Sequence, residues 1–207
     1  MKLYDITQEV FSCCVYPGDP APKREDLASM AKGDLYNLTA FSMCAHNGTH
    51  IDAPRHFIED GKTVDEIAQE KLVGACYVAA FDGVITALDA EAILSSAKLI
   101  SSEAAKRILV KGNATLSYEG AVVFKRAGIW LYGNESQTVG PEDAPLAVHK
   151  LLLSSEVVLL EGVRLSEVAC GGYYLVTAPL LLGACEGAPC RVFLLDDTRF
   201  FESEESI

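Results

Sequence analysis

Short apolar runs rich in β-branched residues alternate with a few helical stretches along the whole chain, and no internal repeat or low-complexity linker divides it. This alternation favours an α/β fold, and several spacings typical of hairpins favour a mixed sheet over a purely parallel one. Expected strands cover residues 1–10, 34–43, 73–81, 84–85, 108–110, 128–132, 157–160 and 191–195, and expected helices cover 87–97 and 145–154, with a second helix start at 101–105. The length of 207 residues allows one substantial core, or one core with a small appendage, and we expect residues 1–207 to form a single domain.

The net charge of the chain limits the classes of partner that we expect it to bind. Seventeen Lys and Arg residues against 29 Asp and Glu residues give a net charge of −12. Because phosphate backbones and anionic lipids attract positive charge, we expect no nucleic-acid partner and no membrane partner. A small anionic substrate would need a local cation, such as a metal. The acidic residues 202–205 are expected to be a solvated end.

The cellular compartment and the redox state of the cysteines are predicted from patterns that the sequence does not contain. No uncharged run approaches the ~20 residues of a membrane helix, and the first residues lack the apolar core of a signal peptide. The seven cysteines are odd in number and include no CxxC pair. We therefore expect a cytoplasmic protein with reduced thiols, most of which fill the core.

The most informative segment is the run from His46 to Phe57, HNGTHIDAPRHF, which holds three of the four histidines. His46, His50 and Asp52 offer two imidazoles and a carboxylate, which are good ligands for a divalent cation. Gly48 and Pro54 are poor helix residues, so we expect a folded loop that brings both imidazoles to one point. The alternative, that each histidine is simply satisfied by a hydrogen bond, is weaker for a cluster than for a lone histidine.

A second pair of candidate ligands lies further along the chain. His149 is on the expected helix, and Glu161 ends an apolar strand. Each alone has an ordinary structural explanation, but an acid at the end of an apolar strand is costly to bury unless it is paired or binds a metal. Beside the first cluster, the pair completes a set for a second cation, with Asp52 as the bridging ligand.

The run from His46 to Phe57 resembles the signature of the metal-dependent cyclase family, which includes bacterial kynurenine formamidase (arylformamidase). The similarity extends to His149, to Glu161 and to the Gly-Ala-Pro-Cys-Arg-Val stretch from Gly187 to Val192, and covers essentially the whole chain. Asn47 fills a variable position of the motif and leaves the choice of substrate open.

This resemblance implies a swivelling β/β/α fold, a homodimer, and a hydrolytic site with one or two metal ions. It assigns metal ligation to five residues, which are His46, His50, Asp52, His149 and Glu161. It assigns proton transfer to His56, which is not a metal ligand. Zn²⁺ is the expected metal because imidazole suits it, and the oxygen ligands keep Mn²⁺ open.

The expected reaction is metal-assisted hydrolysis of a small cyclic or N-acyl aryl amide, with N-formylkynurenine as the named candidate. Bound cations lower the pKa of water and polarise a carbonyl, and His56, with an ordinary pKa of ~6.5, moves protons at neutral pH. A lactam or lactone hydrolase of the isatin-hydrolase kind is the alternative within enzymes. A metal-binding protein without catalysis is the alternative from another class.

Three weaker signals accompany these residues. Thr49 is expected either to help fix the imidazole tautomers or to cap a turn. Residues 134–137 are polar either because they face the site or because they form a loop. Gly171-Gly172 is expected in a loop, without the spacing of a phosphate-binding motif.

Overall fold

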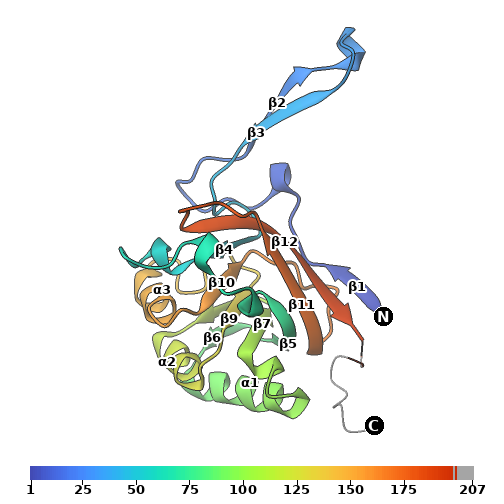
Figure 1. Cartoon of the computed structure of the whole chain (residues 1–207). Coiled ribbons are helices and arrows are strands. Elements are labelled where there is room, and N and C mark those ends of the chain that lie inside the picture. The colour runs from blue at the N-terminus through green and yellow to red at the C-terminus, as the bar shows by residue number, and fades with distance from the viewer. Residues whose placement is uncertain (198, 200–207) are drawn as a thin grey trace.

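The computed structural model describes residues 1–197 and 199, so the expected acidic end at 202–205 lies outside the described residues. A mixed sheet of eight strands forms the centre, in the order β1-β12-β11-β5-β7-β9-β10-β4 (Figure 1). Because β12 also pairs with β4, seven of the strands close into a barrel, and β1 lies beside β12 outside it. The strands of this sheet are β1 (Lys2–Asp5), β4 (His50–Asp52), β5 (Val73–Ala80), β7 (Arg107–Lys111), β9 (Leu131–Asn134), β10 (Val158–Glu161), β11 (Gly171–Pro179) and β12 (Gly187–Asp196). The expected mixed α/β fold is confirmed.

Three helices connect the parallel part of the sheet. Strands β5, β7, β9 and β10 pair in parallel, whereas β1, β4, β11 and β12 pair antiparallel. Parallel neighbours need a crossover, and the chain supplies α1 (Ala87–Ile100), α2 (Tyr118–Ala127) and α3 (Leu146–Leu153), which gather on one side of the barrel (Figure 1). Strands β6 (Gly83–Ile85) and β8 (Ala114–Leu116) form a small parallel pair near these helices.

Alternation along the strands divides the apolar residues between two cores. Ile51, Leu109 and Leu160 belong to the cluster inside the barrel. Their neighbours Ile108 and Leu159 belong to the cluster between the sheet and the helices. Since successive side chains of a strand point to opposite faces, the odd and even positions of β4 and β10 have separate surroundings. This division decides where the polar side chains of the two strands go.

Local signals explain where the helices begin and end. Helix α1 starts with a capping box between Thr86 and Asp89, close to the expected start. The expected segment 101–105 forms only a short 3-10 turn, Ala104–Lys106. Helix α2 was not expected, although Ser117 caps its first turn and Gly128, in the left-handed region at φ 69°, ends it.

Several strand bounds differ from expectation. The first strand stops at Asp5 because Ile6 onward leaves the sheet to support the loop before β4, where Gln8 N–H donates to Thr49 Oγ1. Gly171 and Gly172 do not lie in a loop but open β11, because their pairing with Val78 and Tyr77 of β5 outweighs the poor strand propensity of glycine. The strand expected at 34–43 is shorter, β3 (Leu38–Ser42).

Strands β2 (Lys23–Ala28) and β3 form a hairpin that projects away from the barrel (Figure 1). Its apolar side chains have little cover: Leu35 is 93% exposed, and Tyr36 and Phe41 are more than half exposed. Among the described residues, no helix has the length and apolar character needed to cross a bilayer.

Candidate metal centre

Strand register places three candidate ligands on one face. In the antiparallel pairing of β4 with β10, His50 lies opposite Glu161, and Asp52 lies opposite Leu159. Because Ile51 points into the barrel, His50 and Asp52 point to the outer face, and Glu161 joins them there. These three side chains are buried, each no more than 3% exposed. The alternation of β4 therefore builds half of the site.

The other two candidate ligands come from segments that border this face. His46 lies in the turn that precedes β4, where Gly48 adopts a left-handed φ of 65°, and its side chain is 13% exposed. His149 lies on α3, which covers the same face and is followed, after a short turn, by β10. The expected folded loop is therefore limited to the residues before His50, and His50–Asp52 form a strand instead.

The five side chains form two groups that share Asp52. One group is His46, His50 and Asp52, the other is Asp52, His149 and Glu161, and the ligand atoms in each lie within 4.8 Å of one another. Asp52 Oδ1 lies 2.9 Å from His46 Nδ1 and 3.5 Å from His50 Nε2. Asp52 Oδ2 lies 3.8 Å from His149 Nε2. Glu161 of the second group lies 3.1 Å from His149 Nε2 and also 3.3 Å from His50 Nε2 of the first group.

Main-chain carbonyls orient two of the imidazoles. His50 Nδ1 lies 3.0 Å from Gly48 O, and His149 Nδ1 lies 2.8 Å from Pro145 O. Since a carbonyl only accepts, each Nδ1 carries a proton, and each Nε2 faces the site. Thr49 acts elsewhere: its hydroxyl donates to Gly162 O at 2.8 Å, which ties the loop before β4 to the end of β10.

Burial and close pairing shift the pKa values of these groups. Burial alone would lower the pKa of His46, but its hydrogen bond to Asp52 and the charge of that carboxylate raise it to about 9. The same contact holds the pKa of Asp52 well below its usual range, although burial opposes this. For His149, the hydrogen bond with Glu161 outweighs burial and raises the pKa. The two buried carboxylates therefore attract positive charge to this point.

The residues fit a divalent cation. His46 Nε2, His50 Nε2 and Asp52 Oδ2 are buried and have no hydrogen-bond partner among the described residues. Buried polar atoms are nearly always paired, so three orphaned ligand atoms at one point indicate a missing partner. Two imidazoles with a carboxylate suit Zn²⁺, and the additional carboxylate keeps oxygen-preferring cations such as Mn²⁺ in range.

His56 stands beside these groups and belongs to neither of them. It ends the short 3-10 turn Pro54–His56, and its ring lies 4.1 Å from that of His46 and 6.4 Å from that of His149. Burial, together with the charges of His46 and His149, lowers its pKa, against the opposite effect of Asp52 and Glu161.

A cavity of about 280 Å³ opens onto this centre. Phe57 and Tyr16 supply aromatic rings to it, and Gln137 and Thr138 supply polar groups. It is further lined by Asp19, Cys44, His46, His50, His56, Pro145, His149 and Glu161. Residue 137 thus faces the site, as one of the two interpretations of 134–137 expected.

Glu186 is a neighbour of the centre that the sequence did not single out. It directly precedes β12, and its Oε1 lies 3.4 Å from His46 Nε2. The only signal was its place before the stretch from Gly187 to Val192. Its carboxylate is therefore a neighbour of the ring nitrogen of His46 that has no hydrogen-bond partner.

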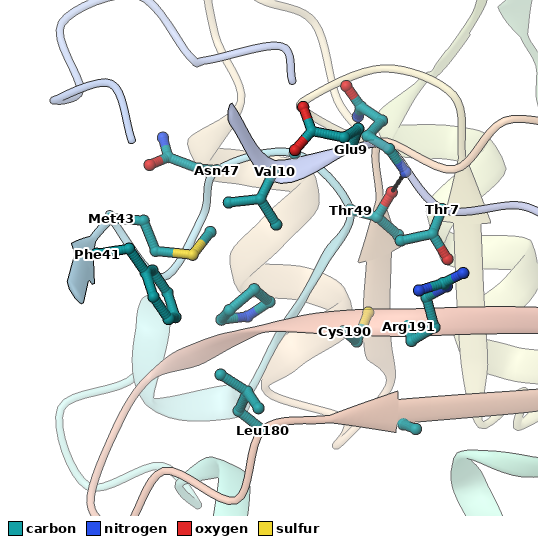
Figure 2. A pocket seen from close by; sticks show the side chains of 14 residues that line it. Thr7, Glu9, Val10, Phe41, Met43, Asn47, Thr49, Leu180, Cys190 and Arg191 are labelled. Carbon is teal, nitrogen blue, oxygen red and sulfur yellow. Dashed lines mark hydrogen bonds between the residues drawn. The ribbon is translucent and has the colours of Figure 1, made fainter. Parts of the chain in front are cut away.

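A second, larger cavity of about 400 Å³ lies on the other side of the loop before β4. Figure 2 shows Val10 and Asn47 on one side of it and Cys190 and Arg191 of β12 on the other. None of the five candidate ligands lines it. Asn47 faces this cavity, and its Oδ1 accepts a hydrogen bond from Cys44 N, so its side chain supports the loop.

Comparisons with known proteins find a matching family, relatives of similar length and a similar solved structure. The model of a family described as putative cyclase matches residues 4–159. A kynurenine formamidase of Salinibacter ruber is 30% identical over 218 residues, which covers 95% of this chain and 98% of the relative. A kynurenine formamidase of Bacillus anthracis is 31% identical, with coverage of 93% and 97%. A solved structure described as a potential metal-dependent hydrolase with cyclase activity superposes with a TM-score of 0.75 at 28% identity, covering 93% of this chain and 96% of that one.

Proposed function

The chain belongs to the putative cyclase family and is a hydrolase of carbon–nitrogen amide bonds, and from this premise we propose that it hydrolyses an aryl formamide such as N-formylkynurenine. One observation carries the proposal: two groups of ligands that share Asp52 face a cavity with aromatic walls, beside a histidine that belongs to neither group. The similarity over 95% of the chain to a kynurenine formamidase supports the choice of substrate.

We assign metal binding to His46, His50, Asp52, His149 and Glu161, with Asp52 shared between two cations or closing the set around one. Zn²⁺ is the proposed metal, with Mn²⁺ as the second choice. A cation held there would lower the pKa of water toward ~7 and polarise the substrate carbonyl. The carbonyl partners of His50 and His149 orient both rings so that their Nε2 atoms would be available to hold the cation.

Two other residues of the cavity have separate roles: one moves protons, and the other contacts the substrate. His56 takes a proton from the attacking water and gives one to the departing aryl nitrogen. Its ring packs against that of His46 at an angle of 31°, which holds it beside the centre. Phe57, whose ring lies 4.9 Å from that of His149, offers a flat apolar surface to an aryl group and keeps water from that side.

The test is turnover of N-formylkynurenine by protein loaded with Zn²⁺ or Mn²⁺, with bound metal measured by mass spectrometry. We expect His56→Ala to keep its metal and to lose about 10²- to 10⁴-fold in kcat. The neighbouring exposed residue offers a matched control, Arg55→Ala, which should leave both unchanged. Unchanged turnover in His56→Ala removes His56 from the mechanism.

The ligand assignment has its own test. We expect His50→Ala and Asp52→Ala to lose bound metal and all measurable activity, because each removes a buried ligand. Full metal content in both variants would contradict the assigned centre. Bound metal with no turnover of any amide or lactam by the wild type would favour the alternative of a metal-binding protein without catalysis.

Compartment and assembly belong to the same proposal. We place the protein in the cytoplasm, which agrees with seven cysteines that are all free. We place it in a homodimer on the family resemblance, and the exposed apolar side chains of the β2–β3 hairpin support this. Light scattering that finds only monomer would refute the dimer.

A further inference from the structure

Gln8 lies on the side of the loop before β4 that faces the second cavity, away from the metal centre. The residue is 8% exposed, and both polar atoms of its side chain are paired. Its Nε2 donates to Gly162 O at 2.7 Å, and its Oε1 accepts from Cys14 N at 2.8 Å. One partner can only accept and the other can only donate, so together they fix the orientation of the amide.

The main chain of Gln8 makes a third hydrogen bond to the same surroundings. Its N–H donates to Thr49 Oγ1 at 2.9 Å, and that hydroxyl donates in turn to Gly162 O at 2.8 Å. The Gly162 carbonyl therefore accepts from both side chains. These buried bonds join Gln8, the loop before β4 and the end of β10 in one closed set, which makes the junction rigid.

One end of this set of bonds reaches His50 through Gly48. Cys14, whose N–H is bonded to Gln8, accepts a hydrogen bond from Gly48 N at 3.0 Å. The carbonyl of Gly48 lies 3.0 Å from His50 Nδ1. Cys13 packs closely against the same glycine, because a Cβ at Gly48 would lie 2.8 Å from Cys13 Cβ. The acceptor that orients the His50 ring is therefore held in place from the segment that follows Gln8.

The other end reaches Glu161 through the residue that follows it. Gly162, the acceptor for Gln8 Nε2, adopts a left-handed φ of 69°. It packs so closely on the loop that a Cβ there would lie 2.4 Å from Gly48 O and 2.6 Å from Gln8 Nε2. Gln8 therefore bonds to neighbours of one candidate ligand from each group, His50 of the first and Glu161 of the second.

The pairing of β4 with β10 shows why these bonds matter for the centre. The ladder is short, and it ends where His50 lies opposite Glu161. Ends of secondary structure open more readily than their centres. The next residues outward, Thr49 and Gly162, are joined by the Thr49 hydroxyl and by Gln8. These side chains therefore close the ladder at the residue pair that carries two candidate ligands.

We propose that Gln8, acting with the hydroxyl of Thr49, is a positioning residue for the metal centre: it keeps His50 and Glu161 at the separation that metal binding requires. This rests on the proposed function, which assigns both residues as ligands. Removing a group that orients a ligand commonly weakens metal binding about 10- to 100-fold. Because Gln8 acts through Gly48 and Gly162, we expect about tenfold, the lower end of that range.

Calorimetric titration of the metal-free protein with Zn²⁺ tests the proposal. We expect Gln8→Met, which keeps the length of the side chain but lacks both polar groups, to raise the Kd for Zn²⁺ about tenfold. Arg107→Met is the control, because it also removes buried side-chain hydrogen bonds, but at the segment that leads into β5. Its Kd should stay within about twofold of the wild type. An unchanged Kd in Gln8→Met, or an equal rise in both variants, would overturn the proposal.

A second pair of variants keeps the test decisive if Gln8→Met does not fold. Thr49→Val keeps the shape of the side chain but loses the hydroxyl between Gln8 N–H and Gly162 O, whereas Thr49→Ser keeps that hydroxyl. We expect Thr49→Val to raise the Kd about tenfold and Thr49→Ser to keep the affinity of the wild type. Equal affinities in these two variants would overturn the proposal.

NMR of the metal-free protein separates this proposal from the proposed function. The His50 Nδ1–H faces Gly48 O in a buried place, so its exchange with solvent should be slow in the wild type. We expect about tenfold faster exchange in Gln8→Met and an unchanged rate in Arg107→Met. If the wild type binds no Zn²⁺, the ligand assignment and the proposed function fail, and this exchange alone decides the role of Gln8. Equal rates in the wild type and Gln8→Met would then overturn the proposal.

Discussion

At the scale of single residues, the position of His46 depends on the missing side chain of Gly187. A Cβ at this position would lie 2.5 Å from His46 Cε1 and 3.0 Å from Ile51 O. Gly187 also pairs with Asp52 across the two strands, so the main chain there has little freedom to yield. The imidazole would have to turn away from Asp52.

We therefore predict that Gly187→Ala weakens metal binding about 10- to 100-fold, the usual effect of disturbing the surroundings of a ligand. Calorimetric titration with Zn²⁺ measures this, and the melting temperature reports any general damage. Gly183→Ala is the control, because a Cβ there meets only Asp65 Oδ2 at an ordinary 3.8 Å. Equal affinities in the two variants would show that His46 can shift without loss.

The candidate ligands and their neighbours were not equally easy to predict from the sequence. His50 and Asp52 were predicted as candidate ligands from the cluster of histidines, but their strand was not predicted. Their spacing of two is that of one strand face, whereas Gly48 and Pro54 favoured a folded loop. Glu186 was not singled out, and residues 134–137 kept two interpretations, because a polar residue in a loop has the same appearance whether it faces solvent or a cavity. Only the pairing of β4 with β10 and β12 reveals which loops meet.

At the scale of elements, Arg107 joins β7 to the segment that leads into β5. The residue is 2% exposed, and its guanidinium donates to three carbonyls, those of Glu70, Lys71 and Ala75. The ring of Trp130 lies 5.1 Å from the guanidinium carbon. A planar group with five donors matches this arrangement, and no other side chain supplies it.

We predict that Arg107→Met lowers the free energy of unfolding by about 2 to 4 kcal/mol, because three carbonyls lose their donor in a buried place. Urea denaturation measures the change. Arg24→Met, on the exposed hairpin, should change it by less than about 0.5 kcal/mol. A small effect in both variants would mean that water reaches the freed carbonyls.

The elements themselves were predictable where a pattern was strong. Helix α1, with its cap at Thr86, and strands β5 and β7 lie close to their expected ranges. Helix α2 was missed although Ser117 and Gly128 mark its ends, since its short apolar pattern is weak. Strand β11 was missed because glycine opens it and only its two partners make it a strand. Closure of the barrel depends on pairing between distant segments, which no local pattern encodes.

At the scale of the whole molecule, the metal centre joins segments that are far apart in sequence. We predict that Zn²⁺ at a hundredfold excess over its Kd stabilises the fold by about 2.7 kcal/mol, which raises the melting temperature by about 5 to 11 °C. A chelator should reverse the shift. Calorimetry with and without metal measures it, and Asp52→Ala should show none. A shift of equal size in that variant would place the stabilising metal elsewhere.

The β2–β3 hairpin concerns the assembly of the molecule. Leu35 and Tyr36 stand exposed on it, and such a group of apolar side chains on a projecting arm is typical of a surface that another chain covers. A second copy is the partner that the proposed homodimer supplies, and a two-fold dimer would bury both arms at once.

We predict that the double variant Leu35→Glu and Tyr36→Lys shifts the mass in light scattering from dimer to monomer, because charged side chains in a dry interface lose their hydration. The pair adds one charge of each sign, so the net charge of the chain stays the same. Leu99→Glu is the control, since Leu99 is 87% exposed on α1, away from the hairpin, and the variant should stay dimeric. If the double variant dimerises as well as the wild type, the interface lies on another face of the barrel.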